Sequence, residues 1–323
     1  MVEAFVLGGF PRSDNARHAM RDLDNGVLPV LEAERTIFME ELLVIGAQVG
    51  LGYRLVSDPV LSWHDLLRPF AEAWRNVAIA GLQRFFDNNF FYRVPVFRDK
   101  PDPARWVLPG RAKLYSARLP KGHGFKVVLP GPVTFTMLSD LGGLRFEDVV
   151  EEVARILGEE ARRAVEVGAA GFEVAEPWLG DPDATKEHAA LVRELFNKYF
   201  AGAGGEKILS VYYHPPSPEA MEELAGAKAD YVAISYVDAP SKAVEALGKA
   251  CPRGIGLGVI NARSIYPDPV ERTRKALREV SGACKESRIA LTTSAPLDLI
   301  PFTEALKKLR ILASHRDTVA EEH

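Results

Sequence analysis

Short apolar runs alternate with longer amphipathic stretches along the chain, and this alternation constrains the fold more than any other feature. Eight β-rich runs lie at 3–8, 51–57, 125–129, 171–175, 208–212, 231–236, 255–260 and 288–293. Nearly continuous apolar character is typical of strands that are buried on both faces of a parallel sheet. Apolar residues recur at helical spacing in the stretches 146–167, 268–280 and 302–313. The alternation predicts a parallel (β/α)8 barrel, with an open doubly wound sheet as the alternative.

The chain length fits one such barrel with an insertion. One barrel takes about 250 residues, so we expect the 323 residues to form a single domain over 1–323. Residues 58–124, between the second and third expected strands, are too many for a simple crossover. In this insertion we expect an amphipathic helix at 65–86, an aromatic patch at 85–97 and a further strand at 113–118. The polar tail at 314–323 is expected to fray.

Composition excludes several classes of function. The net charge of −4, with no basic block, gives no electrostatic reason to bind nucleic acid. No apolar run is long enough to cross a membrane, and the N-terminus lacks the features of a signal peptide. Cys251 and Cys284 lie far apart, which favours a reducing cytoplasm over a disulfide framework. Scarce glutamine and abundant charge point weakly to a thermophilic source.

Polar residues follow several of the expected strands, where the active sites of parallel barrels form. The candidate catalytic residues are Asp58, Glu176, Asn261 and Arg263. A carboxylate inside an apolar run needs a partner, and Arg263 is a candidate partner for Glu176. Polar residues at strand ends also commonly cap helices or bind loop backbone, so each has an equally ordinary structural explanation.

Other site types find little support. No two histidines, and no histidine and cysteine, have metal-ligand spacing, so no metal site is predicted. The glycine-rich stretch 202–205 precedes a strand and lacks the Lys-Ser/Thr of a phosphate loop. The aromatic patch at 85–97 could stack on a ligand ring, although packing in a core or interface is the more common role.

Seven segments, in order, resemble the N-terminal barrel of cobalamin-independent methionine synthase. The opening reads LGGFPR, and a Ser-Asp pair precedes Trp-His-Asp. The segments are 7–12, 57–65, 85–97, 129–134, 176–179, 258–264 and 293–294. They extend over nearly the whole chain, and the resemblance implies the barrel fold independently of the strand count.

In that family a second, C-terminal barrel carries the zinc that activates the thiol of homocysteine for attack on the methyl group of a folate. The positions that match its zinc ligands are Ser210, Tyr212, Tyr236 and Ala295. None of these residue types is a competent zinc ligand. The resemblance therefore implies no zinc chemistry and no bound cofactor in this chain.

The resemblance also implies a binding role. The family's N-terminal barrel uses basic residues to hold the polyglutamate tail of the folate, and the matching residues are Arg17, with His18 beside it, and Arg84. Arg21 lies one helical turn beyond Arg17 and would face the same way. Guanidinium groups suit a row of carboxylates, although a solvated helix face has the same composition. Ala175 replaces an Asp of the family, which leaves the role of that Asp open.

Three functions follow as hypotheses. The chain could be a separate subunit that helps bind a folate-type methyl donor for a separately encoded, zinc-bearing barrel. It could be an independent methyltransferase or decarboxylase of the wider barrel group that includes uroporphyrinogen decarboxylase. It could also be a binding barrel without catalysis. The first is preferred, because the candidate zinc positions lack ligands while the candidate tail-binding positions keep their cations.

Overall fold

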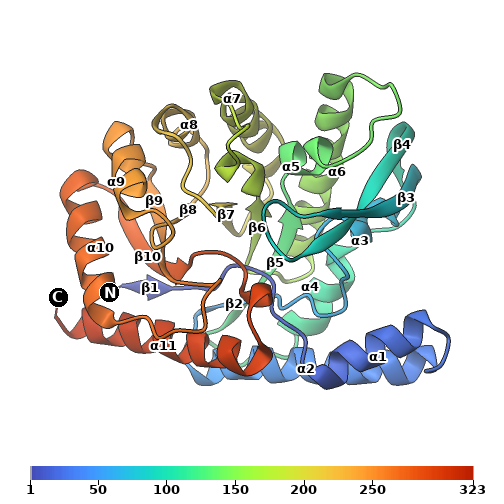
Figure 1. The fold of residues 1–323 in the computed structure, drawn as a ribbon, viewed down its shortest axis with the longest axis horizontal. Coiled ribbons are helices and arrows are strands. Elements are labelled where there is room, and N and C mark those ends of the chain that lie inside the picture. Colours follow the sequence, from blue (N-terminus) through green and yellow to red (C-terminus); the bar gives the residue numbers. More distant parts are fainter. Residues whose placement is uncertain (1, 323) are drawn as a thin grey trace.

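The computed structural model, which describes residues 2–322, is a parallel eight-stranded barrel surrounded by helices (Figure 1). The strands follow the order β1-β10-β9-β8-β7-β6-β5-β2 around the sheet. They are β1 (Glu3–Ala4), β2 (Leu55–Ser57), β5 (Gly124–Pro130), β6 (Gly171–Ala175), β7 (Glu206–Val211), β8 (Tyr231–Ser235), β9 (Gly254–Ile260) and β10 (Arg288–Thr293). The predicted (β/α)8 barrel is therefore confirmed, and each of its eight expected runs overlaps an observed strand.

The first and second strands close the barrel without a regular ladder. β1 pairs with β10 over two residues, and β2 pairs with β5. Between them, the Ser57 hydroxyl donates to the carbonyl of Val6, and Gly9 N donates to the carbonyl of Asp58 over 3.3 Å. β1 and β2 are thus joined by a few separate hydrogen bonds. We call this junction the seam of the barrel.

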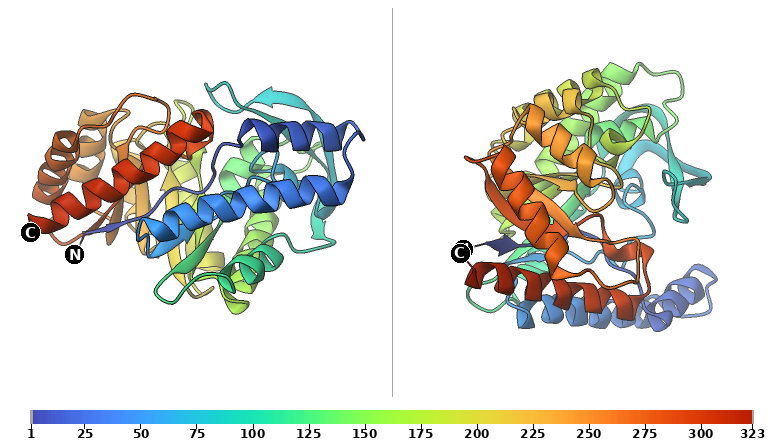
Figure 2. Two further views of the ribbon diagram at one scale, coloured as in Figure 1. Left: turned by 90° about the horizontal axis from the view of Figure 1, so that it is seen from below. Right: turned by 60° about the vertical axis from the view of Figure 1, so that its left-hand side comes forward.

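Helices cover the outside of the barrel. Two long ones, α2 and α11, cross the same face in Figure 2, and α1 projects beside them. The α-helices are α1 (Asp14–Asp24), α2 (Val30–Gly50), α3 (Arg68–Ala71), α4 (Leu108–Ser116), α5 (Pro132–Met137), α6 (Phe146–Glu166), α7 (Lys186–Leu195), α8 (Pro218–Leu224), α9 (Pro240–Lys249), α10 (Val270–Ala283) and α11 (Phe302–Glu321). Shorter helical turns are η1 (Pro177–Gly180), η2 (Phe196–Phe200) and η3 (Leu297–Leu299). No helix of the described chain is long and apolar enough to span a membrane.

The C-terminal tail is helical rather than frayed within the described residues. α11 continues to Glu321 because its last turns pack against α10: Val319 is buried, and His315 Nδ1 lies 2.9 Å from the hydroxyl of Thr273. The expectation of a loose tail from 314 was therefore wrong, and residue 323 lies outside the described residues.

The insertion differs from its predicted structure. Instead of a helix at 65–86, the short α3 is followed by a β-hairpin of β3 (Trp74–Arg84) and β4 (Phe91–Pro103). The aromatic patch supplies part of the partner strand, so cross-strand pairing decides the structure of a segment that is ambiguous by itself.

The expected strand at 113–118 is also wrong, because residues 113–116 form the end of α4 and the next two lie in the turn after it. Glu160, on α6, accepts hydrogen bonds from the backbone N–H groups of Val107 and Leu108 at the start of α4. This carboxylate satisfies free donors of a helix N-terminus from a distant part of the chain. The local sequence shows nothing of that contact.

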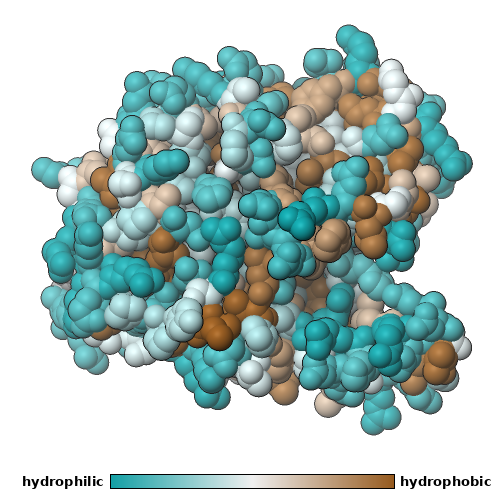
Figure 3. All heavy atoms as spheres, viewed as in Figure 1, coloured by the Kyte–Doolittle hydropathy of each residue, from teal (hydrophilic) through white to brown (hydrophobic). Residues whose placement is uncertain are grey.

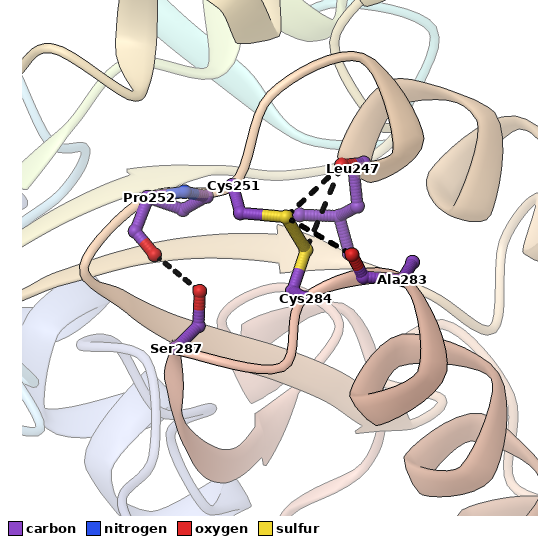
Figure 4. Close-up of a disulfide and its surroundings, with 6 residues drawn as sticks. All are labelled: Leu247, Cys251, Pro252, Ala283, Cys284 and Ser287. Carbon is purple, nitrogen blue, oxygen red and sulfur yellow. Dashed lines mark hydrogen bonds between the residues drawn. A yellow bond between two sulfur atoms is a disulfide. The ribbon is translucent and has the colours of Figure 1, made fainter.

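Cys251 and Cys284 form a disulfide, contrary to the expectation of two unlinked thiols (Figure 4). Cys251 follows α9 and precedes β9, while Cys284 follows α10 and precedes β10. The two strands are neighbours, and Gly254 pairs with Arg288. The parallel topology thus brings together two cysteines that lie 33 residues apart in sequence.

Candidate functional site

A cavity of about 870 Å³ opens at the carboxyl ends of the barrel strands. Segments that follow β1, β2 and β10 line it, together with the end of β7 and the tip of the β3–β4 hairpin. In the space-filling view of Figure 3 this face is hollowed between the hairpin and the α1–α2 pair. The volume lies within the range of small-molecule sites, so the position and size are those of a ligand pocket.

Aromatic side chains form much of the cavity wall. The rings of Phe10 and Phe302 meet edge to face with centroids 5.6 Å apart, and Phe85 lies 6.4 Å from Tyr213. The aromatic residues of the lining are Phe10, Trp63, Phe85, Phe90, Tyr212, Tyr213 and Phe302. The aromatic patch therefore serves in two ways: Tyr92 and Phe97 are buried in the core, and Phe85 and Phe90 border the cavity.

Arg12 holds the loop after β2 against the loop after β1. Its Nε donates to the carbonyl of Leu61 over 2.6 Å, and its Nη2 donates to the carbonyl of Trp63. Burial lowers the pKa of Arg12, and the charges of nearby carboxylates, Asp298 among them, oppose that effect. The guanidinium therefore fixes the shape of the cavity rim as well as its charge.

Asp298, in η3 after β10, lines the cavity with an unsatisfied carboxyl group. Its Oδ1 is buried and has no hydrogen-bond partner among residues 2–322. Burial raises the pKa of Asp298 to about 6, while a hydrogen bond from its own backbone N–H and the charge of Arg12 act in the opposite direction. The hydroxyl groups of Tyr212 and Tyr213 border the same space, and burial raises both of their pKa values well above the usual range. Both phenols are consequently protonated donors at neutral pH.

Replacing Asp298 by Asn is expected to stabilise the protein at alkaline pH. Because the folded-state pKa is raised, the wild-type protein loses stability as the pH rises from about 4 through 6, and an amide does not share that loss. A shift of about two pKa units corresponds to about 3 kcal/mol. Urea unfolding at pH 4 and pH 8 should show a difference between the variants only at pH 8, whereas Asp14→Asn should show none. Equal stability of Asp298→Asn and wild type at pH 8 would contradict this assignment.

The cations expected to bind a polyglutamate tail lie at the mouth of this cavity or beside it. Arg17 and Arg21 are exposed on α1, where they pair with Asp14 and Asp22. Arg17 borders the cavity, and His18 is exposed next to it. Arg84, at the end of β3, is exposed with its Nη1 3.7 Å from Asp87 Oδ1. Exposed ion pairs of this kind contribute little stability, so the guanidinium groups can exchange their partners for a ligand.

The candidate catalytic residues lie in buried or bonded networks outside the cavity lining. Asp58 is fully buried and binds Arg111, whose Nε and Nη2 lie 2.8 and 2.6 Å from its two oxygens. Arg111 also donates to Glu41, on α2. Asp58, through Arg111, thus links the end of β2 with α2 and α4.

Glu176 caps α5. Its carboxylate accepts from Val133 N over 3.0 Å, and from Thr134 N and Oγ1 over 2.7 and 2.6 Å. Burial raises its pKa to about 7, against the effect of these bonds. A Cβ added to Gly131 would lie 2.0 Å from the carboxyl carbon, so the close fit requires glycine there.

Arg263 is not the partner of Glu176. Its Nη2 lies 2.7 Å from Asp238 Oδ1 and 3.3 Å from the carbonyl of Tyr213, and its backbone N–H donates to the side chain of Asn261. The expected pairing was wrong because α5, directly beside Glu176, supplies backbone donors that satisfy its carboxylate. Arg263 and Asn261 instead hold the loop that carries Tyr213.

The barrel also contains a buried ion pair that was not predicted from the sequence. Lys126, on β5, and Glu173, on β6, are both fully buried and bind each other through Nζ and Oε2. Glu173 also accepts from Ser210 Oγ over 2.9 Å and from Gly8 N over 3.0 Å. The signal was present, because a charged residue interrupts each of two apolar strands.

The positions that match the family's zinc ligands do not fit a zinc ion. The Ser210 hydroxyl donates to Glu173, and the Tyr236 hydroxyl donates to Glu279. Tyr212 and Ala295 offer no thiolate or imidazole. Within residues 2–322 no three His, Cys, Asp or Glu side chains are grouped as a metal site requires.

Comparisons with known proteins agree on one family. The family described as "Cobalamin-independent synthase, N-terminal domain" matches residues 67–285. The 5-methyltetrahydropteroyltriglutamate–homocysteine methyltransferases of Streptococcus thermophilus and Streptococcus pneumoniae are each 26% identical over 227 residues, which are 69% of this chain. The matched segment spans 29% of the length of each of these relatives.

Solved structures share the fold. The B12-independent methionine synthase from Shewanella sp. W3-18-1, determined in complex with selenomethionine, superimposes with a TM-score of 0.83 at 16% identity, covering 100% of this chain and 98% of that one. A putative vitamin-B12 independent methionine synthase from Listeria monocytogenes gives a TM-score of 0.77 at 13% identity, covering 99% of both chains. With a family match over more than half of its length, the chain belongs to the family of the N-terminal domain of cobalamin-independent methionine synthase.

Proposed function

We propose that this chain is a methyl-donor-binding barrel, which holds the polyglutamate tail of a folate-type donor while a separate, zinc-bearing barrel transfers the methyl group to homocysteine. The observation that carries the proposal is the placement of exposed arginines on two elements that border the cavity: Arg17, which lines it, and Arg21 on α1, and Arg84 on the hairpin, next to the lining residue Phe85. Family membership supplies the class of ligand.

The chemistry of the tail suits these residues. Each glutamate of the tail presents one carboxylate, and a guanidinium can bind it through two N–H donors. Arg17 and Arg21 are one helical turn apart, so they meet successive groups of an extended anion along α1. His18 adds a polar contact beside them. On this proposal, the chain's own part in the reaction is to bind and orient the donor.

A division of labour between two barrels follows. The positions equivalent to zinc ligands lack suitable donors in this chain, so thiol activation belongs to the partner. We expect methyl transfer from a triglutamylated donor only when this chain and a zinc-bearing barrel are mixed. Methyl transfer by this chain alone would instead favour an independent enzyme of the wider barrel group.

The tail interaction is testable by calorimetry. At low salt, 5-methyltetrahydropteroyl triglutamate should bind at least about tenfold more tightly than the monoglutamate, since a few charge-assisted contacts easily supply 1.4 kcal/mol. The variant Arg17→Ala/Arg21→Ala/Arg84→Ala should lose this preference and keep its affinity for the monoglutamate.

A matched control uses Arg278→Ala, which removes an exposed arginine of α10. It should bind both ligands as the wild-type protein does. The preference should also weaken as salt rises, because exposed charges are screened. If wild type binds the mono- and triglutamate equally well at low salt, the proposed role of the arginines is wrong.

A further inference from the structure

In one carboxyl group of the cavity lining, that of Asp298, an oxygen has no hydrogen-bond partner among residues 2–322. Asp14 pairs with Arg17, and Asp65 accepts from three backbone N–H groups, including those of Leu67 and Arg68. Asp298 differs from these two carboxylates, because no other residue of the described chain donates a hydrogen bond to it or forms an ion pair with it. Unsatisfied groups of this kind are rare in folded proteins and call for a specific explanation.

Arg12 does not provide the missing partner. Although its charge acts on Asp298, its Nε and Nη2 are directed to the carbonyls of Leu61 and Trp63. The Gly9 backbone packs beside the carboxylate: an added Cβ would lie 3.0 Å from Pro296 Cβ and 3.8 Å from Asp298 Oδ2. Gly9 has a φ of 113°, which disfavours any other residue there. No side chain of this loop position therefore covers the carboxylate.

The surroundings of Asp298 are aromatic. Tyr212 and Tyr213 meet edge to face with ring centroids 4.8 Å apart, and both line the cavity. Tyr213 has a φ of 76°, a conformation that costs free energy in a non-glycine residue. Arg263 stabilises that conformation by donating to the carbonyl of Tyr213, with its guanidinium 5.8 Å from the ring centroid. The loop is thus held in a strained form that presents a ring to the cavity.

We propose that this cavity is a binding site in its own right for a flat, cationic nitrogen compound, such as an amidinium or a protonated nitrogen heterocycle. The positive nitrogen meets Asp298, and the flat ring packs against the aromatic wall. A carboxylate to which no other residue donates is the complement of a cation with N–H groups, and the electron-rich faces of aromatic rings favour the same charge. Arg17 lines this cavity whereas Arg21 and Arg84 do not, so variants of the latter two can test the site separately from the proposed function.

Three molecules of one shape test the charge preference: benzamidine, benzamide and benzoate, which carry charges of +1, 0 and −1. By calorimetry or ligand-observed NMR at pH 7.5, benzamidine should bind with a Kd in the millimolar range or below. Benzamide and benzoate should bind at least about tenfold more weakly. Equal or tighter binding of benzoate would overturn the proposal and assign the cavity to anions held by Arg12.

Two variants locate the site. Asp298→Asn should weaken benzamidine binding at least about tenfold, whereas Asp14→Asn, which removes the same charge at the cavity edge, should leave it unchanged. Phe85→Leu should weaken binding severalfold by removing one aromatic wall. Thermal unfolding checks that each variant is folded. Full affinity of Asp298→Asn for benzamidine would exclude this site.

A variant of the two arginines outside the cavity lining separates the two proposals. Arg21→Ala/Arg84→Ala should bind benzamidine as wild type does, although its preference for the triglutamate tail is weakened. If that variant loses benzamidine binding as well, the cavity is not an independent site, and this inference fails while the proposed function stands.

Discussion

Replacing Lys126 by Met should destabilise the protein by about 3–5 kcal/mol, the cost of leaving a buried charge without its partner. Lys126 and Glu173 are both fully buried within the barrel, and desolvation lowers the pKa of Lys126 against the attraction of Glu173. In the variant, Glu173 keeps its bonds to Ser210 and Gly8 but has no cation to balance its charge.

The double variant Lys126→Met/Glu173→Leu should recover much of the loss, because removing both charges also removes the desolvation penalty. Lys242→Met, which changes an exposed lysine of α9, is the control and should have little effect. Urea unfolding measures all three variants. A Lys126→Met protein that unfolds at the same urea concentration as wild type would show that the pair carries no such energy.

Reduction of the disulfide should be the second large effect. Closing a loop of 33 residues restricts the unfolded chain, and the chain-entropy relation gives about 4 kcal/mol for a loop of this size. Cys251→Ser/Cys284→Ser should therefore unfold at a lower temperature than wild type, and wild type in reductant should approach the variant.

A thiol assay makes the result specific. The native protein should expose no free thiol before reduction and two per chain after it, and the reductant should not alter the stability of the serine variant. Because the disulfide precedes β9 and β10, at the end of the barrel opposite the cavity, ligand binding by the folded, reduced protein should be unchanged. Two free thiols in the untreated native protein would contradict the linkage.

The barrel was predictable because each strand is marked by a short apolar run in its own sequence. The runs at 171–175 and 288–293 coincide with β6 and β10, since each is apolar, short and bounded by helix-forming sequence. The insertion was not predictable in the same way. The β3 strand exists because β4 pairs with it, and α4 begins where Glu160 caps it from α6. Neither contact is visible within the segment that it determines.

The site was predictable in part for a similar reason. Glu176 and Arg263 were catalytic candidates because they follow strands. Their hydrogen bonds instead give them structural roles, which depend on residues elsewhere in the chain. Asp298 follows the last strand at a greater distance, inside a short helical turn, and its unusual property is a missing partner. A missing contact leaves no pattern in a sequence, so only the folded arrangement reveals it.

The seam between β1 and β2 has a consequence for the cavity wall. β1 joins β10 over only two residues, and it meets β2 through a few bonds rather than a ladder. The loop from Gly8 to Arg12, which forms one wall of the cavity, continues directly from this strand. Because Phe5, Val6 and Leu7 are each only 2% exposed, the packing of buried side chains, more than backbone pairing, holds this wall in place.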